Sequence, residues 1–481
     1  KQRRATLTIP STTAVAKAAY DASLWAGVMV EWVAGTGHAM RADMDGRTIR
    51  GAARARFHRL SRVGWLVAGA ACLAASPAGA ATASDSCPIL NDPAPRPDTR
   101  FASIDAAVRG GVGTLYPGAV LLIAYHGEIV HRAAFGNAQT LTTTPEGDLR
   151  PLTPPRPMTV DTPFDMASIT KVEATTAAIL HLVGRGKLSL DDRLGTLLPA
   201  FHSTDKAGIT VRQLLTHRSG VWEWQPTWLH RAPSGGALPY LAALPLRYPI
   251  GARFAYSDLG FMILGAVVAK VSGIPLDRYV REQIYRPLGM TGTGFLPDAG
   301  QRRRAAATSQ GDAYQRRMAE TGKPYPRAPY PPAQPFSGYR SRVLVGEAND
   351  ANAALGWGGV AGHAGLFSTA TDVARYAQVL SNGGCYGRWR LAPAATVSAF
   401  EQTPFDPDQA LGFRKTQLAG IAAPFFGHSG FTGTWFAVSP QLGLTVVLLT
   451  NRVHRPDGEP YPSLDALRET VLRGAVAASG Q

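Results

Sequence analysis

The pattern of apolar and polar positions changes twice along the chain. Near each end, apolar β-branched runs flank short turns, which predicts two β-hairpins. The first covers 120–135 around His126-Gly127, and the second joins 434–438 to 444–449. Between the hairpins, apolar residues recur at helical spacing. This spacing predicts helices over 168–183, 211–215, 260–271, 276–285 and 371–381, and a last one over 464–477.

This order of elements predicts an α+β fold. Strands at both ends and helices between them favour one antiparallel sheet built from both chain ends, flanked by helices, with an all-helical subdomain inserted. We expect the α/β part to comprise about 100–160 and 385–481, and the helical insert about 165–380. Residues 301–340, rich in Arg, Pro and Tyr, are predicted to be a long surface excursion.

Composition narrows the class of protein. Of 481 residues, 45% are hydrophobic and 17% charged, which excludes an intrinsically disordered chain and a polytopic membrane protein. The net charge is +15, but no aromatic-interleaved basic stripe accompanies it, so we expect no nucleic-acid partner. A mild basic excess suits an anionic envelope surface, and solubility alone explains it as well.

The N-terminal region resembles a targeting segment. A basic stretch precedes the uncharged apolar run 63–75, and small residues follow it, as in a secretory signal peptide. We therefore interpret 44–83 as a signal peptide, with an uncleaved signal-anchor that tethers the protein to the membrane as the alternative. Residues 1–43 are expected to lie upstream of the natural start or to be disordered. A single folded domain would then be 84–481, in a periplasmic or secreted protein.

The three cysteines form no metal-binding spacing. Cys72 falls in the segment expected to be removed. Cys87 and Cys385 would either be bridged in an oxidising compartment or remain two free thiols. We expect no metal and no cofactor. His217, His363 and His428 lie too far apart in sequence, without a helical His pair, to indicate a metal site.

A Ser-x-x-Lys tetrad opens the predicted helix over 168–183. Ser168 stands at the helix start, in the positive field of the N-terminus, and Lys171 follows one turn later on the same face. We expect burial to reduce the basicity of Lys171, so that it accepts the serine proton. An N-cap serine followed by a surface lysine is the structural alternative. A second tetrad, Ser203–Lys206, is placed in a loop.

Two further motifs lie downstream. Tyr256-Ser257-Asp258 precedes an apolar helix, where a tyrosine can relay protons; a helix cap is the alternative. The second motif, His428-Ser429-Gly430, precedes a strand, where small residues let a substrate approach the backbone; a Gly-rich turn is the alternative.

In their order and approximate separations, these motifs resemble those of the penicillin-recognising serine hydrolases. The chain is similar to the class C β-lactamase-related family over about 115–475. Further stretches that look like this family are Leu214–Val221, Tyr256–Gly265, Pro287–Thr291 and Gly358–Thr369. Two others, Ala306–Met318 and Gly346–Ala353, look like the subfamily with penicillin-binding protein 4B-like carboxypeptidases. Asn349 stands where that subfamily often has a histidine.

The resemblance implies a β-lactamase/transpeptidase-like fold and a role for each motif residue. Ser168 would be the acylated nucleophile, and Lys171 its base or the group that lowers its pKa. Tyr256 would carry a proton to the leaving group. Asp258 replaces a familiar Asn that contacts the substrate amide, and would either contact a substrate with a different leaving group or bind Lys171. His428 replaces a lysine, so that a partly charged imidazole would hold a substrate carboxylate.

The remaining implied residues frame the substrate. Ser429 and Gly430 would line its path, and the backbone N–H groups of Ser168 and Phe431 would form the oxyanion hole. The function implied is a serine hydrolase that forms an acyl-enzyme on D-Ala-D-Ala peptides of the cell wall. Small esters are the alternative substrates. A non-catalytic muropeptide- or β-lactam-binding protein is the second alternative.

Ser429 is another candidate nucleophile in the sequence. Gly427–Phe431 nearly matches the Gly-x-Ser-x-Gly elbow of α/β-hydrolases, with Ser429 at its centre. The fifth position is Phe431 rather than glycine, and no alternating parallel βα units surround it. The sequence therefore disfavours this fold.

Overall fold

A computed structural model describes residues 86–94, 98–230, 237–329, 335–456 and 461–480. The expectations for 1–43 and for the signal segment 44–83 fall outside the described residues. The description below concerns the domain that follows them.

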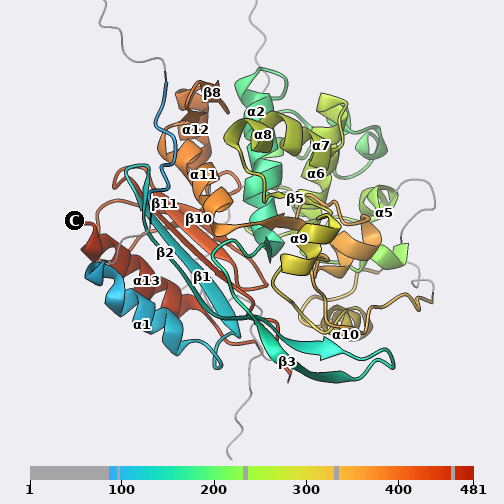
Figure 1. The fold of residues 1–481 in the computed structure, drawn as a ribbon. Coiled ribbons are helices and arrows are strands. Elements are labelled where there is room, and N and C mark those ends of the chain that lie inside the picture. The colour runs from blue at the N-terminus through green and yellow to red at the C-terminus, as the bar shows by residue number, and fades with distance from the viewer. Residues whose placement is uncertain (1–85, 95–97, 231–236, 330–334, 457–460, 481) are drawn as a thin grey trace, which may run out of the picture. The chain divides into compact units, whose positions relative to one another are not determined.

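A seven-stranded antiparallel sheet forms the centre of the domain (Figure 1). Its order is β3-β2-β1-β12-β11-β10-β9. The strands are, in chain order, β1 (Gly118–Tyr125), β2 (Glu128–Thr143), β3 (Leu149–Pro157), β9 (Arg414–Thr416), β10 (Phe425–Ser429), β11 (Trp435–Ser439) and β12 (Leu444–Thr450). Both chain ends build this sheet, and both predicted hairpins are present, so the predicted α+β fold is confirmed.

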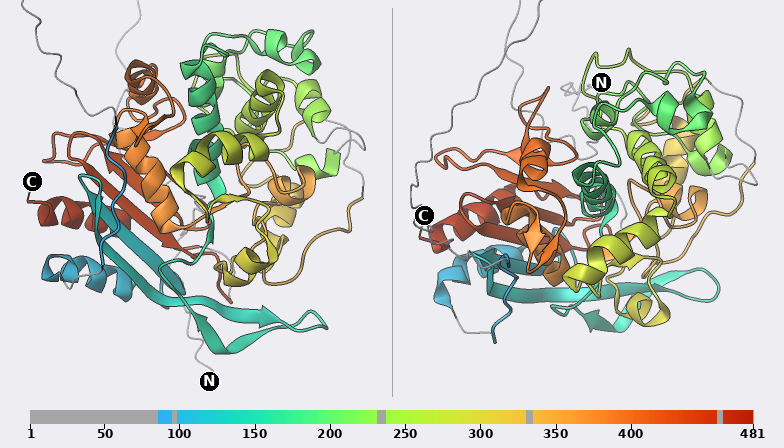
Figure 2. Two further views of the ribbon diagram at one scale, coloured as in Figure 1. Left: turned by 45° about the horizontal axis from the view of Figure 1, so that its top comes forward. Right: turned by 90° about the horizontal axis from the view of Figure 1, so that it is seen from above.

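Both faces of the sheet are covered. On β1, Val120 and Leu122 face the large core shared with the helical region, whereas Leu121 and Ile123 face a second core. Alternation along a strand explains this division. The second core also contains the apolar faces of α1 (Ala102–Gly110) and α13 (Asp465–Ala478), which lie side by side across the sheet (Figures 1 and 2).

The other face packs against α11 (Ala370–Ser381) and the helical region. The helices of that region predicted from periodicity are α4 (Val211–Leu215), α6 (Asp258–Ser272) and α7 (Leu276–Val280), the last extended by η7 (Arg281–Tyr285) and α8 (Arg286–Leu288). Elements without a clear periodic signal are α3 (Leu194–Leu197), α5 (Leu238–Ala243), α9 (Ala299–Arg304), α10 (Ala313–Thr321) and α12 (Ala394–Glu401). A small sheet joins β4 (Phe164–Asp165), β6 (Leu366–Ser368) and β5 (Gly294–Phe295), and β7 (Cys385–Tyr386) pairs with β8 (Trp389–Arg390).

The segment predicted as one helix over 168–183 is composite. A 3-10 turn, η3 (Ala167–Ile169), leads into a π-helical turn, η4 (Lys171–Thr176), and then into α2 (Ala177–Gly184). Thr175 in the π turn donates to the carbonyl of Gly362 at 2.6 Å. The pattern predicts a helix correctly, but the wider turn at its start is set by tertiary contacts.

Helix α6 shows why a polar residue opens an apolar helix. The Ser257 hydroxyl accepts from the Gly260 amide at 2.9 Å, and Gly273, with φ 71°, ends the helix. In the described part of the chain, no single helix is long and apolar enough to cross a membrane. Only α6 taken together with Leu276–Leu288 reaches that length and composition, and this pair is bent by 70°.

The prediction that 301–340 is a surface excursion was wrong in part. Gly311 has φ 91°, and a Cβ on it would lie 2.0 Å from the carbonyl oxygen of Arg340, so the segment doubles back closely on itself. Arg340 pairs with the buried Asp312 at 2.6 Å. These contacts present α10 to the pocket described below.

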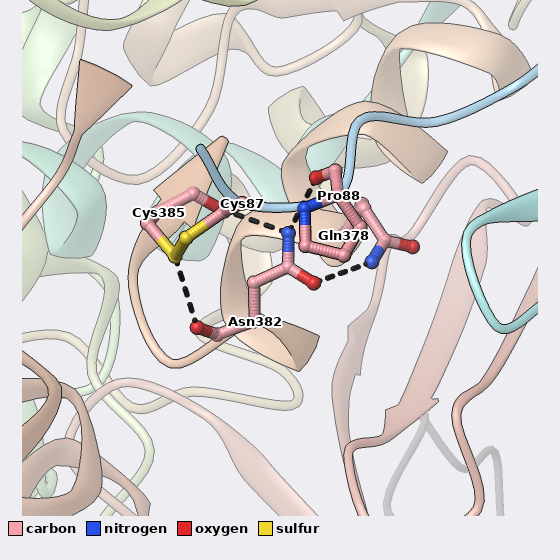
Figure 3. The surroundings of a disulfide bond; sticks show 5 residues. All are labelled: Cys87, Pro88, Gln378, Asn382 and Cys385. Atoms are coloured by element: carbon pink, nitrogen blue, oxygen red, sulfur yellow. Dashed lines mark hydrogen bonds between the residues drawn. A yellow bond between two sulfur atoms is a disulfide. The ribbon is translucent and has the colours of Figure 1, made fainter. Parts of the chain in front are cut away.

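A disulfide ties the start of the domain to its body. Cys87 and Cys385 are bonded, which resolves the alternative that the sequence left open (Figure 3). Asn382 supports the junction, since its side-chain amide donates to the carbonyls of Pro88 at 2.7 Å and Cys385 at 3.0 Å. Gln378 orients that amide by donating to its oxygen at 2.7 Å.

Candidate active site

Ser168 lies on a tight turn between β4 and η4. Ala167, directly before it, has φ 44°, in the left-handed region that non-glycine residues rarely adopt. The buried carboxylate of Asp165 holds this turn by accepting from the Ala167 amide at 2.8 Å, and it also accepts from the Asn349 amide at 2.6 Å. Burial raises the pKa of Asp165 to about 6, although both amides oppose that shift. Several contacts thus hold the strained backbone of Ala167 in place, as is typical of strained residues at functional sites.

Lys171 points its ammonium group at Ser168. Its Nζ lies 3.0 Å from the Ser168 Oγ, 3.2 Å from the carbonyl oxygen of His363 and 2.7 Å from Asp258 Oδ1. The first two contacts are hydrogen bonds that the ammonium group donates, and the third is an ion pair. The lysine side chain has no solvent exposure.

The expectation that Lys171 loses basicity was wrong. Burial does lower the pKa of Lys171, but Asp258 and Tyr256 raise it by more, so that it lies above its usual value. Burial is the largest single influence, but the combined effect of these two neighbours exceeds it. Lys171 is therefore a charged hydrogen-bond donor to Ser168 at neutral pH.

Tyr256 and Asp258 flank the N-cap of α6. The Lys171 ammonium lies 4.9 Å from the centre of the Tyr256 ring. His217, with φ 56°, packs against the other side of the site, its ring centre 4.5 Å from that of Tyr256, and its Nδ1 accepts from the Ser257 amide at 3.0 Å. Burial, followed by the charge of Lys171, lowers the pKa of His217 well below its usual value. His217 is thus neutral, and through its contacts with Tyr256 and Ser257 it positions the segment that precedes α6.

His428 lies near the end of β10, its ring centre 6.1 Å from that of Tyr256. The side chain is buried; burial and then the charge of Lys171 lower its pKa to about 3. Its Nδ1 donates to the Ser429 carbonyl at 2.8 Å, which leaves Nε2 as the acceptor nitrogen, without a partner among the described residues. The expectation of a partly charged imidazole was therefore wrong, because the sequence did not show this burial.

The loop after β10 docks onto the serine turn. Thr432 donates to the Asp165 carbonyl at 2.7 Å, and Thr434 to the Met166 carbonyl at 3.1 Å. Gly430 lies so close that a Cβ on it would be 2.5 Å from the Met166 carbonyl oxygen. This contact explains the requirement for glycine. It also places Phe431, the second predicted oxyanion donor, beside the pocket that Ser168 lines.

The pocket over Ser168 is aromatic and acidic. Besides Ala167 and Ser168 it is lined by Trp224, Asp258, Tyr314, Gln315, Met318, Tyr325, Asn349, Asp350, His363, Ala364 and Phe431. Among these described residues there is no lysine or arginine. Searching the described ranges for three or more His, Cys, Asp or Glu side chains that could hold a metal ion finds no such group.

Comparison with known proteins identifies the family. The family model described as Beta-lactamase matches residues 104–468. The chain belongs to the β-lactamase family. An Escherichia coli (strain K12) protein named "Putative D-alanyl-D-alanine carboxypeptidase" is 34% identical over 385 residues, covering 75% of this chain and 84% of that protein. A Bacillus subtilis (strain 168) protein named "N-acetylmuramyl-L-alanine amidase" is 32% identical over 390 residues, covering 76% and 84%.

Solved structures agree on the fold. A penicillin-binding protein homologue from Caulobacter crescentus has a TM-score of 0.60 at 22% identity, covering 80% of this chain and 99% of that one. A class C β-lactamase from Rhodobacter sphaeroides has a TM-score of 0.55 at 18% identity, covering 79% and 99%. Both support the β-lactamase/transpeptidase-like fold that the motifs implied.

Within this β-lactamase family member, the two other serine candidates lack the setting of a nucleophile. Lys206 of the second Ser-x-x-Lys is buried and bonds to Asp205 and to the Ala242 carbonyl, so that tetrad is structural. Ser429 ends a strand of an antiparallel sheet, which rules out the α/β-hydrolase elbow.

Sequence reasoning missed a pair of residues in the pocket. His363 Nε2 lies 2.9 Å from Asp350 Oδ1, while the His363 carbonyl accepts from Lys171. From the sequence, His363 was weighed as a possible metal ligand and Asp350 was not singled out; both line the pocket. Both belong to stretches that resemble the family, Gly358–Thr369 and Gly346–Ala353, and that resemblance was the only signal for them.

Proposed function

We propose that this β-lactamase-family chain is a serine hydrolase that acts through an acyl-enzyme on Ser168, with cell-wall peptides ending in D-Ala-D-Ala as its substrates. The observation that carries this proposal is the hydrogen bond from the buried Lys171 ammonium to the Ser168 hydroxyl, at the floor of a pocket. A fixed positive charge beside the hydroxyl stabilises the alkoxide that forms as it attacks.

Lys171 neither gives up nor gains a proton in the acylation step. Ser168 Oγ attacks the substrate carbonyl carbon, and its proton moves to the Tyr256 hydroxyl oxygen while Tyr256 gives its own proton to the leaving nitrogen. The C–N bond breaks, the amine departs, and an ester remains on Ser168. The amides of Ser168 and Phe431 would bind the oxyanion. Water then attacks that ester, and the acid and Ser168 are released.

Lys171 stays protonated throughout the reaction because the carboxylate of Asp258 stabilises its positive charge. A buried lysine without a partner tends to release its proton. Here the carboxylate 2.7 Å away opposes that release. We propose that Asp258 serves Lys171 in place of contacting the substrate, the second of the two roles that the sequence left open.

A second candidate function is cleavage of an amide or small ester without an adjacent carboxylate. His428 is neutral, and no described Lys or Arg lines the pocket, so these groups provide no cation for the terminal carboxylate of a D-Ala-D-Ala peptide. A relative is named "N-acetylmuramyl-L-alanine amidase", and an amide of this kind lacks the adjacent carboxylate when the L-Ala carboxyl is itself blocked by a further amide bond. A non-catalytic binding protein is disfavoured, since Ser168, Lys171 and Tyr256 are all brought together.

We further propose that the domain works outside the cytoplasm, periplasmic or secreted. The disulfide between Cys87 and Cys385 supports this, because disulfides persist in oxidising compartments. The peptide of peptidoglycan would be its substrate partner there.

The experiment compares turnover of three substrates by the wild type and Ser168→Ala. These are diacetyl-Lys-D-Ala-D-Ala, N-acetylmuramyl-L-alaninamide and p-nitrophenyl acetate. Release of D-Ala alone supports the carboxypeptidase, and release of L-alaninamide or only of nitrophenol supports the second candidate. The acyl-enzyme proposal is wrong if Ser168→Ala retains the wild-type rate on whichever substrate is cleaved.

A further inference from the structure

The two carboxylates of the pocket differ in how their charge is balanced. Asp258 forms an ion pair with Lys171. Asp350 has His363 as its ion-pair partner, and no lysine or arginine among the described residues lies within ion-pair distance of it. The nearby Asp312 is neutralised by Arg340. Asp350 is thus the lining carboxylate without a fixed cation.

One carboxylate oxygen of Asp350, Oδ2, has only a weak contact within the protein. Its Oδ1 accepts from His363 Nε2 at 2.9 Å and from the Ala353 amide at 2.7 Å. Its Oδ2 has one long contact, 3.4 Å from Gln315 Nε2. The side chain is 19% exposed. Burial acts to raise the pKa of Asp350, but His363 and the Ala353 amide outweigh it, so the pKa lies below its usual value and the group is anionic.

His363 contributes a second polar atom without a partner in the described part of the chain. Its Nε2–H donates to Asp350 at 2.9 Å. The other ring nitrogen, Nδ1, is buried and has no partner among the described residues, and the His363 side chain is only 1% exposed. A carboxylate oxygen with one long contact and an unpartnered ring nitrogen in the lining of one pocket favour a polar ligand there.

The pocket walls favour a cation. Trp224, Tyr314, Tyr325 and Phe431 line it together with Asp350. Aromatic faces attract cations, most strongly where water is excluded. Arg317 and Arg452 already lie over the rings of Tyr314 and Phe431, each 5.8 Å from the ring centre. The anionic carboxylate of Asp350 lines the same pocket, and no lysine or arginine belongs to its described lining.

We propose that this pocket binds a primary ammonium group on the acyl part of the substrate, with Asp350 as its counter-ion. The acyl part is indicated because Tyr256, which serves the leaving group, does not line the pocket. The ammonium is either the α-amine of a short acyl group or the side-chain amine of a longer one. This inference rests on the proposed function only in taking Ser168 as the nucleophile.

The test compares matched p-nitrophenyl esters with and without an ammonium group. One pair is D-alanine and N-acetyl-D-alanine esters; the other is Nα-acetyl-lysine and Nα,Nε-diacetyl-lysine esters. Each kcat/KM is divided by the rate of spontaneous hydrolysis. We expect the wild type to prefer the ammonium ester of one pair by about tenfold, and the pair that shows this preference identifies the source of the amine.

The ratio of interest is the corrected kcat/KM of the ammonium ester divided by that of its acetylated partner. Asp350→Asn should bring this ratio close to one. Asp191→Asn, which removes an exposed carboxylate paired with Arg212, should leave it unchanged. A role of Asp350 in structure alone would slow both esters equally. An unchanged ratio in Asp350→Asn, or no preference in either pair, overturns the proposal even where Ser168-dependent hydrolysis stands.

A binding measurement needs no turnover. Calorimetric titration of n-butylammonium chloride into Ser168→Ala, and into Ser168→Ala combined with Asp350→Asn, should show about tenfold weaker binding in the double variant. Sodium butyrate should bind neither. Equal binding of n-butylammonium to the two proteins, or no binding to Ser168→Ala, overturns the proposal. If the wild type hydrolyses none of the esters faster than Ser168→Ala does, that result counts against the proposed function instead.

Discussion

Lys171 and Asp258 form a buried ion pair whose nitrogen and oxygen lie 2.7 Å apart. The lysine has no solvent exposure and the aspartate side chain has 11%. This pair sets the charge of the group that donates to Ser168, and therefore sets how the serine is activated.

Replacing Asp258 by Asn should move the alkaline limit of activity. In the wild type the pKa of Lys171 lies above its usual value, so no activity is lost through Lys171 up to about pH 9. In Asp258→Asn, burial dominates, the pKa falls, and the alkaline limb of kcat/KM moves to lower pH. A pH-rate profile measures this. An alkaline limb in the same place in both proteins would contradict the role given to Asp258.

The same substitution should also lower stability, by on the order of 3 kcal/mol, because it leaves a buried ammonium without its counter-charge. The contribution of the raised Lys171 pKa is fully present below the unfolded value near 10.5 and is lost as pH rises through the folded one. Denaturant unfolding at pH 7, well below that range, measures the loss of stability in Asp258→Asn. Asp191→Asn, at an exposed ion pair, is the control and should change little.

His428 should stay neutral down to about pH 4. Its pKa is lowered from the usual value to about 3 by burial, so an NMR titration of its ring should show no change between pH 5 and 8. The folded state binds this proton less tightly than the unfolded state. Its contribution to stability is therefore present above about pH 6.5 and is lost as pH falls toward 3. A midpoint between pH 6 and 7 would restore the charged imidazole that the sequence suggested.

Much of the fold was predictable because its signals are local. The hairpin turn at His126-Gly127 and the Ser257 cap of α6 are each encoded within a few residues. The outline of the site followed from the spacing of Ser168 and Lys171, with the later motifs joined to it through family resemblance. The elements that periodicity missed are short, such as α9, or lie at sheet edges, such as β3.

What could not be predicted depends on contacts between distant segments. The charge of Lys171 is decided by Asp258, 87 positions away in the sequence, and the neutrality of His428 by its burial. Neither follows from residue type. The role of 301–340 was misread because an Arg-, Pro- and Tyr-rich stretch is typical of an exposed loop, whereas here Tyr314 and Tyr325 line the pocket.

Gly430→Ala should disable the site while leaving the fold intact. A Cβ there would meet the Thr434 hydroxyl at 2.2 Å and the Met166 carbonyl at 2.5 Å, so the loop that carries Phe431 must move away from Ser168. Misplacing one oxyanion donor typically costs about 10²–10³ in rate. Gly110→Ala, at the end of α1 with no atom within 4 Å of the new Cβ, is the control. Equal kcat in the two variants would contradict this account of the oxyanion loop.

Breaking the disulfide should lower stability without lowering activity. Cys87 and Cys385 are 298 positions apart, and closing so long a loop stabilises a domain by roughly 3–5 kcal/mol. Neither cysteine lines the pocket. We expect Cys385→Ser to melt at a lower temperature and to keep its kcat at 25 °C. A melting temperature equal to that of the oxidised wild type would show that the bridge is dispensable.

The most direct test is intact-mass spectrometry after incubation with a penicillin and, separately, with a phosphonate ester. The wild type, Ser168→Ala and Ser203→Ala are compared, the last because Ser203 opens the other Ser-x-x-Lys of the chain. We expect one covalent adduct on the wild type and on Ser203→Ala, located to Ser168 by peptide mapping, and none on Ser168→Ala. An adduct that persists in Ser168→Ala would contradict the central claim that Ser168 is the acylated residue.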